Sequence, residues 1–290
     1  MQHMATPTVA LESTVITHGL PFPHNLAIAR LMEAEVQQQG AIPATIGVIA
    51  GNIVVGLDDA QLEQLARSTT AHKLSRRDLP VALAQQWDGG TTVAATMAIA
   101  RRAGISVFAT GGIGGVHRGY QHTLDISADL TELARTPVLV VCAGAKAILD
   151  LPATLEYLET QSVPIMGYQT DEFPAFYSQS SGMPIPACAD SPAEVAAIWR
   201  AHRVLGNEAG MLLCVPPPAE SALPRAEVEA AIGRALQQAE RAGVRGPAVT
   251  PFLLAAMAKE THGESITTNT ALLRQNARVA AQVAVVISQQ

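Results

Sequence analysis

Two short apolar runs, each followed at once by small and polar residues, constrain the fold of this 290-residue chain more than any other feature. They cover residues 105–108 and 138–141, and their length and sharp boundaries are typical of buried strands. Similar runs alternate along the chain with helical patterns, for example at residues 23–39, 93–102 and 225–242. This alternation predicts an α/β fold with a largely parallel, mixed central sheet and helices on both faces, an α/β/α sandwich.

The length allows one large domain or two small ones. Single hydrophobic cores stop growing at about 250–300 residues, and no repeat or linker interrupts the chain. We therefore expect a single domain over residues 1–290. Hydrophobic residues make up 48% of the chain and charged residues 15%. So few charges indicate that copies of the chain associate.

Charge and patterning argue against several classes of protein. The net charge of −6 does not suit a nucleic-acid-binding surface, which needs clustered Lys and Arg. No run of about 18 apolar residues occurs, and the first residues lack a signal-peptide pattern. Cys142, Cys188 and Cys214 lie far apart in the sequence and are expected to be reduced. We expect a cytoplasmic protein that binds neither membranes nor nucleic acids.

A glycine-rich loop follows the first apolar run. Gly111, Gly112, Gly114 and Gly115 fall within five positions. Glycine permits positive φ and lets a ligand approach bare backbone amides, so the loop suits an anion such as phosphate. No Gly-Lys-Ser/Thr follows, which argues against a Walker A loop, and the third glycine of a dinucleotide fingerprint is missing.

Titratable residues come soon after this loop. His117 is a candidate base, and Asp125 and Asp129 are candidate metal ligands. The second apolar run leads to Lys146, at a strand-to-helix turn where α/β proteins keep their chemistry. We expect a helix to begin at Lys146 and to be bent or restarted at Pro152. A cation in a first helical turn opposes the helix dipole, which favours a functional role for this lysine.

Three other segments leave two interpretations open. Glu12 ends a predicted strand and is followed by hydroxyls and His18, as in either a site or an ordinary polar turn. The basic segment 72–80 is either a solvated loop or the cation set for a phosphorylated substrate. Asn269 precedes a predicted closing helix over residues 271–287 and is either its cap or a functional residue.

Six stretches, in the same order, resemble the pseudouridine-5′-phosphate glycosidase family, once named for indigoidine synthase A. They are residues 11–23, 109–119, 125–130, 142–152, 167–171 and 267–270. The resemblance runs from about Ala10 to Val285, nearly the whole chain. We expect no fused carbohydrate-kinase domain of the kind that some relatives carry.

The resemblance implies reversible cleavage of the carbon–carbon glycosidic bond of pseudouridine 5′-phosphate to uracil and ribose 5-phosphate. Because no oxygen leaving group exists to be protonated, the family uses an amine that attacks the anomeric carbon and holds the opened sugar as an imine or related adduct. Lys146 matches this nucleophile, and Glu12 matches the proton donor, acting at the ribose ring oxygen or the base. Asp125 matches the residue that holds a divalent metal, typically Mn²⁺, one per subunit, with waters completing its shell.

The resemblance also assigns substrate-binding positions and implies a homotrimer. The substrate-binding set is Lys73, Val93, Thr110, His117, Ser127, Ala128, Asp129 and Asn269. Two other functions stay open. One is another Schiff-base lyase or isomerase acting on a sugar phosphate, and the other is a non-catalytic sugar-phosphate-binding protein.

Overall fold

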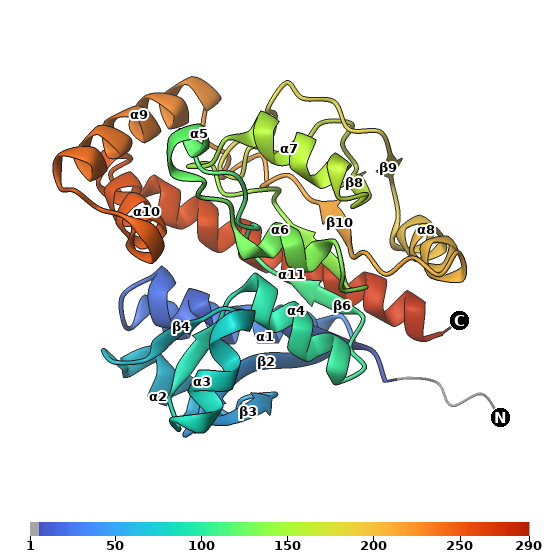
Figure 1. Cartoon of the computed structure of the whole chain (residues 1–290). Coiled ribbons are helices and arrows are strands. Elements are labelled where there is room, and N and C mark those ends of the chain that lie inside the picture. The colour runs from blue at the N-terminus through green and yellow to red at the C-terminus, as the bar shows by residue number, and fades with distance from the viewer. Residues whose placement is uncertain (1–5, 290) are drawn as a thin grey trace.

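A ten-stranded mixed sheet forms the centre of the molecule (Figure 1). The computed structural model describes residues 6–289, apart from the side chain of Pro247. The strands lie in the order β4-β5-β2-β1-β6-β7-β10-β8-β9, and β3 also pairs with β2. Neighbouring strands are parallel except where β2 meets β3 and β5. The predicted fold class, a largely parallel mixed sheet, is confirmed.

The strands and helices have the following bounds. The strands are β1 (Thr8–Leu11), β2 (Ile42–Ile49), β3 (Asn52–Val55), β4 (His72–Leu74), β5 (Gly89–Thr91), β6 (Val107–Ala109), β7 (Leu139–Cys142), β8 (Ile165–Tyr168), β9 (Cys188–Ala189) and β10 (Met211–Cys214). The α-helices are α1 (His24–Gln38), α2 (Asp59–Arg67), α3 (Leu79–Ala84), α4 (Val93–Arg102), α5 (Tyr120–Thr123), α6 (Ala128–Leu133), α7 (Leu151–Thr160), α8 (Pro192–Val204), α9 (Arg225–Arg241), α10 (Val249–Glu260) and α11 (Glu264–Ser288). Short helical turns are η1 (Val15–Gly19), η2 (Arg76–Asp78) and η3 (Gly246–Ala248).

Helices cover both faces of the sheet. The long helix α11 packs against β1, β6 and β7 and is flanked by α1 and α8, while α4 and α6 pack together on the other face (Figure 1). The central strands β1, β6 and β7 are buried along almost their whole length. Their sequences are therefore continuously apolar instead of alternating, as expected for strands covered on both faces.

Two predicted helix starts are wrong. Helix α7 begins at Leu151 and not at Lys146, because Asp150 accepts a hydrogen bond from the Ala153 amide and Pro152 sits in the first turn. Residues 143–149 instead bond to the glycine loop, where the Lys146 amide donates to Ile113 O at 3.1 Å. Lys146 therefore lies in a loop, and the helix-dipole argument does not apply to it.

The closing helix is also longer than expected. Helix α11 begins at Glu264, because the hydroxyls of Thr268 and Thr270 bond to carbonyls four residues earlier and so fit inside a helix. Asn269 consequently lies within the helix and is not its cap.

The cysteines are free, as expected. Cys142 and Cys214 are buried opposite each other on β7 and β10, and Cys188 is exposed. Within residues 6–289, no helix combines the length and the apolar character needed to cross a membrane.

Candidate active site

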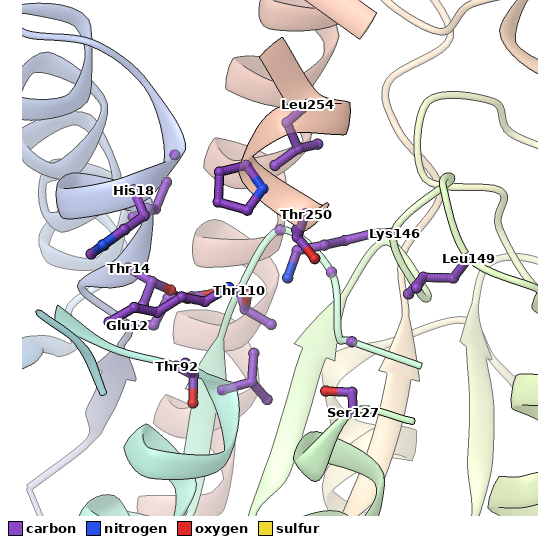
Figure 2. Close-up of a pocket in the computed structure, with 18 of the residues that line it drawn as sticks. Glu12, Thr14, His18, Thr92, Thr110, Ser127, Lys146, Leu149, Thr250 and Leu254 are labelled. Carbon is purple, nitrogen blue, oxygen red and sulfur yellow. Dashed lines mark hydrogen bonds between the residues drawn. The ribbon is translucent and has the colours of Figure 1, made fainter. Parts of the chain in front are cut away.

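The carboxyl ends of the central strands open into a cavity of about 730 Å³ (Figure 2). Glu12 follows β1, Thr110 follows β6, and Lys146 lies in the loop after β7. Because these strands are parallel neighbours, their carboxyl ends lie at one edge of the sheet, where α/β proteins bind ligands. Every residue expected to act in catalysis, substrate binding or metal binding lines this cavity: Glu12, Lys73, Val93, Thr110, His117, Asp125, Ser127, Ala128, Asp129, Lys146 and Asn269.

All three lysines of the chain also line this cavity. They are Lys73 from β4, Lys146 from the loop after β7, and Lys259 from α10. Burial lowers the pKa of Lys73, and the charge of Lys146 lowers it further, while Asp129 and Glu12 act in the opposite direction. The positive charges of Lys73 and Lys146 repel each other in a partly enclosed space, so this part of the cavity favours binding of an anion.

The Glu12 carboxylate is buried, with 7% of the residue exposed, and both of its oxygens accept hydrogen bonds from hydroxyls. Thr110 Oγ1 donates to Oε1, and Thr14 Oγ1 donates to Oε2. Figure 2 shows Glu12 and Thr14 on one side of the cavity, with Lys146 reaching in from the opposite side. Of the two hydroxyls that follow Glu12, that of Ser13 bonds to Ile46 O at 2.6 Å and joins strands instead.

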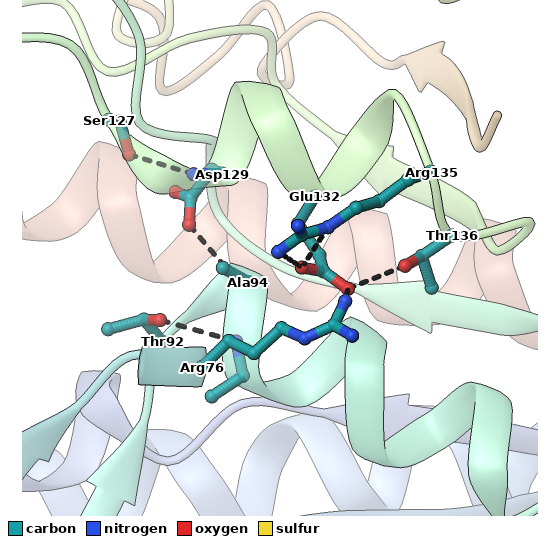
Figure 3. Close-up of polar contacts among 9 residues, drawn as sticks. Arg76, Thr92, Ala94, Ser127, Asp129, Glu132, Arg135 and Thr136 are labelled. Carbon is teal, nitrogen blue, oxygen red and sulfur yellow. Dashed lines mark hydrogen bonds and ion pairs between the residues drawn. The ribbon is translucent and has the colours of Figure 1, made fainter. Parts of the chain in front are cut away.

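Asp129 is buried to the same extent as Glu12, with 6% exposed, but backbone amides hold it (Figure 3). The Ala94 amide donates to Oδ1 at 2.9 Å, and the Gly114 amide donates to Oδ2 at 2.8 Å. These bonds tie the start of α4 and the glycine loop to α6. Asp129 as a metal ligand stays a prediction, because the structure shows only that each of its oxygens accepts from a backbone donor.

The basic segment 72–80 agrees in part with each interpretation, a solvated loop and a cation set for a phosphorylated substrate. Lys73 and Arg77 both line the cavity, although the Arg77 side chain is 81% exposed. Arg76 Nη1 donates to Glu132 Oε1 at 2.6 Å, and the fully buried Glu132 carboxylate also accepts from Arg135 and Thr136 (Figure 3). Glu132 thus links the segment after β4 to α6.

The glycine loop differs in its backbone conformation from what its glycines permit. None of its four glycines has positive φ. The amides of Ile113 and Gly114 donate to Gly144 O and Asp129, and the Val116 amide donates to Thr154 Oγ1. A Cβ on Gly114 would lie 2.2 Å from Ser127 Oγ. The glycines therefore allow close packing between the loop and α6.

His117 and Asp125 lie on a loop at the cavity wall, with His117 Nδ1 3.8 Å from Asp125 Oδ2. Burial lowers the pKa of His117. Asp125 opposes this effect, and Lys146 and Lys73 add to it. The Asp125 side chain is 39% exposed, so its oxygens are accessible from the cavity. Among residues 6–289, no cluster of three or more His, Cys, Asp or Glu could hold a metal. Asp125 fits a hard cation only as a single carboxylate ligand, completed by water and substrate oxygens.

Sequence reasoning assigned no individual role to four residues of this region. Thr14 and His18 stood in the noted polar stretch, and Phe176 lines the cavity with a φ of 63°. Asn276 donates from α11 to Thr110 O at 2.8 Å and to Gly111 O at 3.4 Å. The polar stretch signalled the first two, whereas no local pattern distinguishes Phe176 or Asn276 from core residues.

Comparisons with known proteins agree with this geometry. A family model described as indigoidine synthase A like protein matches residues 2–286. A protein of Chloroflexus aurantiacus named pseudouridine-5′-phosphate glycosidase is 66% identical over 285 residues, covering 97% of this chain and 93% of the relative.

Two solved structures share the fold. The prealnumycin C-glycosynthase AlnA in complex with ribulose 5-phosphate is 42% identical with a TM-score of 0.90, covering 98% of this chain and 92% of that one. An indigoidine synthase A-like protein from Thermotoga maritima is 34% identical with a TM-score of 0.91, covering 99% and 98%. The chain therefore belongs to the indigoidine synthase A-like protein family.

Proposed function

We propose that this protein, as a single catalytic domain, is a pseudouridine-5′-phosphate glycosidase that reversibly cleaves the substrate to uracil and ribose 5-phosphate. The observation that carries the proposal is one cavity with a lysine and a buried carboxylic acid on opposite sides. Relatives as similar as 66% identical bear this name, and a 42% identical neighbour binds ribulose 5-phosphate.

Lys146 and Glu12 carry the chemistry in this proposal. The neutral amine of Lys146 attacks the anomeric carbon and displaces the ring oxygen, which takes up a proton, so the ring opens and an amine adduct forms. The bond between the anomeric carbon and uracil then breaks, its electron pair goes to the base, which takes up a proton, and the sugar phosphate stays on Lys146 as an imine. Glu12 supplies a proton at the ribose ring oxygen or at the base, and water finally releases the sugar phosphate from Lys146.

The substrate phosphate binds near Lys73 in this proposal. Val93 and Ala128 have apolar side chains, so they contact substrate through backbone amides. Each is the first residue of its helix, where the amide has no partner within the helix. Their neighbours Ala94 and Asp129 already donate to described side chains. Ser127, His117 and Asn269 complete the substrate contacts.

Asp125 holds a divalent cation, which we propose to be Mn²⁺, one per subunit. Bound there, the cation supplies positive charge that neutralises substrate oxygens. Asp125 contributes one accessible carboxylate, and its loop is fixed by the His117 amide, which donates to Asp125 O at 3.0 Å.

We further propose a cytoplasmic homotrimer. The exposed apolar residues Leu124, Val204 and Leu205, at 79%, 80% and 77% exposure, support association between copies of the chain. The free state of Cys142 and Cys214, which face each other without a disulfide, suits a reducing compartment. Light scattering tests the oligomeric state.

The deciding experiment measures uracil release from pseudouridine 5′-phosphate with Mn²⁺, for wild type, Lys146→Ala and the control Lys259→Ala. We expect release by wild type and Lys259→Ala, and a loss of at least about 1,000-fold in Lys146→Ala. Borohydride reduction followed by mass spectrometry should find the sugar phosphate on Lys146. Equal release by wild type and Lys146→Ala overturns the nucleophile assignment.

The same experiment separates the two alternatives. A trapped adduct with other sugar phosphates, without uracil release, indicates another Schiff-base lyase or isomerase. Binding of ribose 5-phosphate with neither adduct nor uracil release indicates a non-catalytic binding protein.

A further inference from the structure

Each oxygen of the Glu12 carboxylate accepts a hydrogen bond from a threonine hydroxyl, which its assignment as proton donor does not by itself require. We infer that Thr14 and Thr110 form a two-hydroxyl clamp that keeps the Glu12 carboxyl group in place in both its ionised and its protonated states, with Asn276 holding the Thr110 arm. This inference rests on the proposed function, because it concerns Glu12 as the group that exchanges a proton.

The two arms of the clamp come from separate parts of the chain. Thr14 lies two positions after Glu12, and Thr110 lies 98 positions away at the end of β6. One hydroxyl reaches each carboxylate oxygen, so rotation of the carboxyl group about its last bond breaks both hydrogen bonds. A carboxylate keeps further acceptor sites on the same oxygens, so the clamp leaves room for a substrate contact.

An ordinary structural role does not explain the Thr14 hydroxyl. Thr14 occupies the N-cap position of η1, where a threonine commonly accepts a bond from a helix amide. Here its side chain makes no such capping bond. Its hydroxyl is directed to Glu12 instead.

The Thr110 arm is fixed through its backbone. The Thr110 amide donates to Val141 O at 3.0 Å on the neighbouring strand. On the other side, Asn276 Nδ2 donates to Thr110 O at 2.8 Å. Asn276 is fully buried, and its Oδ1 accepts no hydrogen bond from residues 6–289. Among these residues, its hydrogen bonding is therefore directed to the carbonyls of Thr110 and Gly111.

Hydroxyl groups suit a carboxyl group that gains and loses a proton. A hydroxyl can donate or accept, and its hydrogen rotates to suit. When Glu12 is ionised, both threonines donate to it. When Glu12 carries the proton, one threonine oxygen can accept that O–H while the other still donates, so the carboxyl group keeps two partners. Backbone amides can only donate, so they cannot accept the O–H of a protonated carboxyl group.

The first test compares steady-state kinetics of Thr14→Val, which removes the hydroxyl at nearly constant volume, with Thr14→Ser, which keeps it. Hydrogen bonds to charged groups predict a kcat about 10–100-fold lower for Thr14→Val, with KM changed by less than about threefold. We expect Thr14→Ser to retain kcat within about threefold of wild type.

Thr45→Val is the matched control. Thr45 Oγ1 also donates to a glutamate carboxylate, Glu33 Oε1 at 2.5 Å, but Thr45 does not line the cavity among the described residues. Its loss should leave kcat within about twofold of wild type, because the lost bond is remote from substrate. The clamp is overturned if Thr14→Val retains wild-type kcat, or if Thr14→Ser is as slow as Thr14→Val.

A second measurement does not depend on the proposed substrate. Crystal structures of wild type across a range of pH should show the Glu12 carboxyl group in one orientation, since the clamp holds either protonation state. Thr14→Val should show it rotated or in alternative orientations. An unchanged, ordered Glu12 in Thr14→Val overturns the clamp even if wild type releases no uracil. If wild type releases uracil and Thr14→Val has the same kcat and Glu12 orientation as wild type, the clamp is overturned and the proposed function is not.

Discussion

Glu12 and Asp129 line the same cavity and are buried almost equally, at 7% and 6% exposure, yet different donors hold them. Two threonine hydroxyls bond to Glu12, and two backbone amides bond to Asp129. Burial therefore cannot explain the difference between these two regions. The hydroxyls can reverse their roles as donors and acceptors, whereas the amides cannot. The hydroxyls around Glu12 can bond to a carboxyl group that gains or loses a proton, whereas the amides around Asp129 use its carboxyl group to join segments of the chain.

The position of each carboxylate in the fold agrees with this contrast. Glu12 stands at the end of the central strand β1. Asp129 lies in the first turn of α6 and bonds to the start of α4 and to the glycine loop. Glu132, on the same short helix, bonds to Arg76 and so adds the segment that follows Lys73. Helix α6 therefore connects three other segments of the cavity wall.

The largest expected effect comes from Glu12→Gln, which removes the exchangeable proton at nearly constant shape. We predict that kcat falls about 10²–10⁴-fold, as for loss of a general acid. We also predict a change of less than about 0.5 kcal/mol in the free energy of unfolding, because the threonine hydroxyls can turn to accept from the new amide. Kinetics and denaturant unfolding measure the two quantities. A large loss of stability would show that Glu12 is primarily a structural residue.

The same chemical change at the other carboxylate, Asp129→Asn, should give the opposite balance. The new NH₂ group faces a backbone amide that can only donate, so Ala94 or Gly114 loses its partner. Leaving one buried donor unpaired predicts a free energy of unfolding lower by about 1–3 kcal/mol. We expect KM to rise more than kcat falls, because the segments around the bound phosphate are displaced. Stability equal to wild type would contradict the contrast between the two regions.

The sequence predicted the sheet and most helices because their signals are local. Apolar runs bounded by turn residues marked the central strands, and Thr92 marked the start of α4. The helix expected at Lys146 was wrong because hydrogen bonds to the glycine loop, far away in sequence, fix that backbone. Non-local bonds override local propensity in such segments.

The candidate site was likewise predictable from the sequence only in part. Residue types such as Glu12, Lys146 and Asp125 stand out in a sequence because their chemistry is rare in apolar surroundings. A sequence does not show which group a hydroxyl bonds to. Ser13 and Thr14 follow Glu12 side by side, but only the folded structure shows that Ser13 bonds to β2 and that Thr14 bonds to the Glu12 carboxylate. The glycines are equally ambiguous in a sequence, because close packing and positive φ both require glycine, and the structure shows close packing here.

The smallest expected effect concerns pH. His18, in η1 next to the Glu12 region, has a pKa lowered by burial and by the nearby Lys73 and His72. The unfolded chain therefore binds a proton near pH 6.5 that the folded protein does not accept until lower pH. The free energy contributed by neutral His18 is fully present above about pH 6.5 and is lost as pH falls through the folded pKa. The amides that hold Asp129 do not titrate, so pH acts on the two regions unequally.

We predict that the melting temperature of wild type falls between about pH 7.5 and pH 5.5 and that His18→Asn reduces this fall. His117, whose pKa is also lowered chiefly by burial, contributes the remaining fall in the same direction. Asp129→Asn should melt lower at every pH but with the same pH dependence as wild type, because it leaves both histidines and the groups that lower their pKa values in place. A steeper pH dependence in Asp129→Asn would mean that its carboxylate is coupled to the histidines, and the two regions would then not be independent.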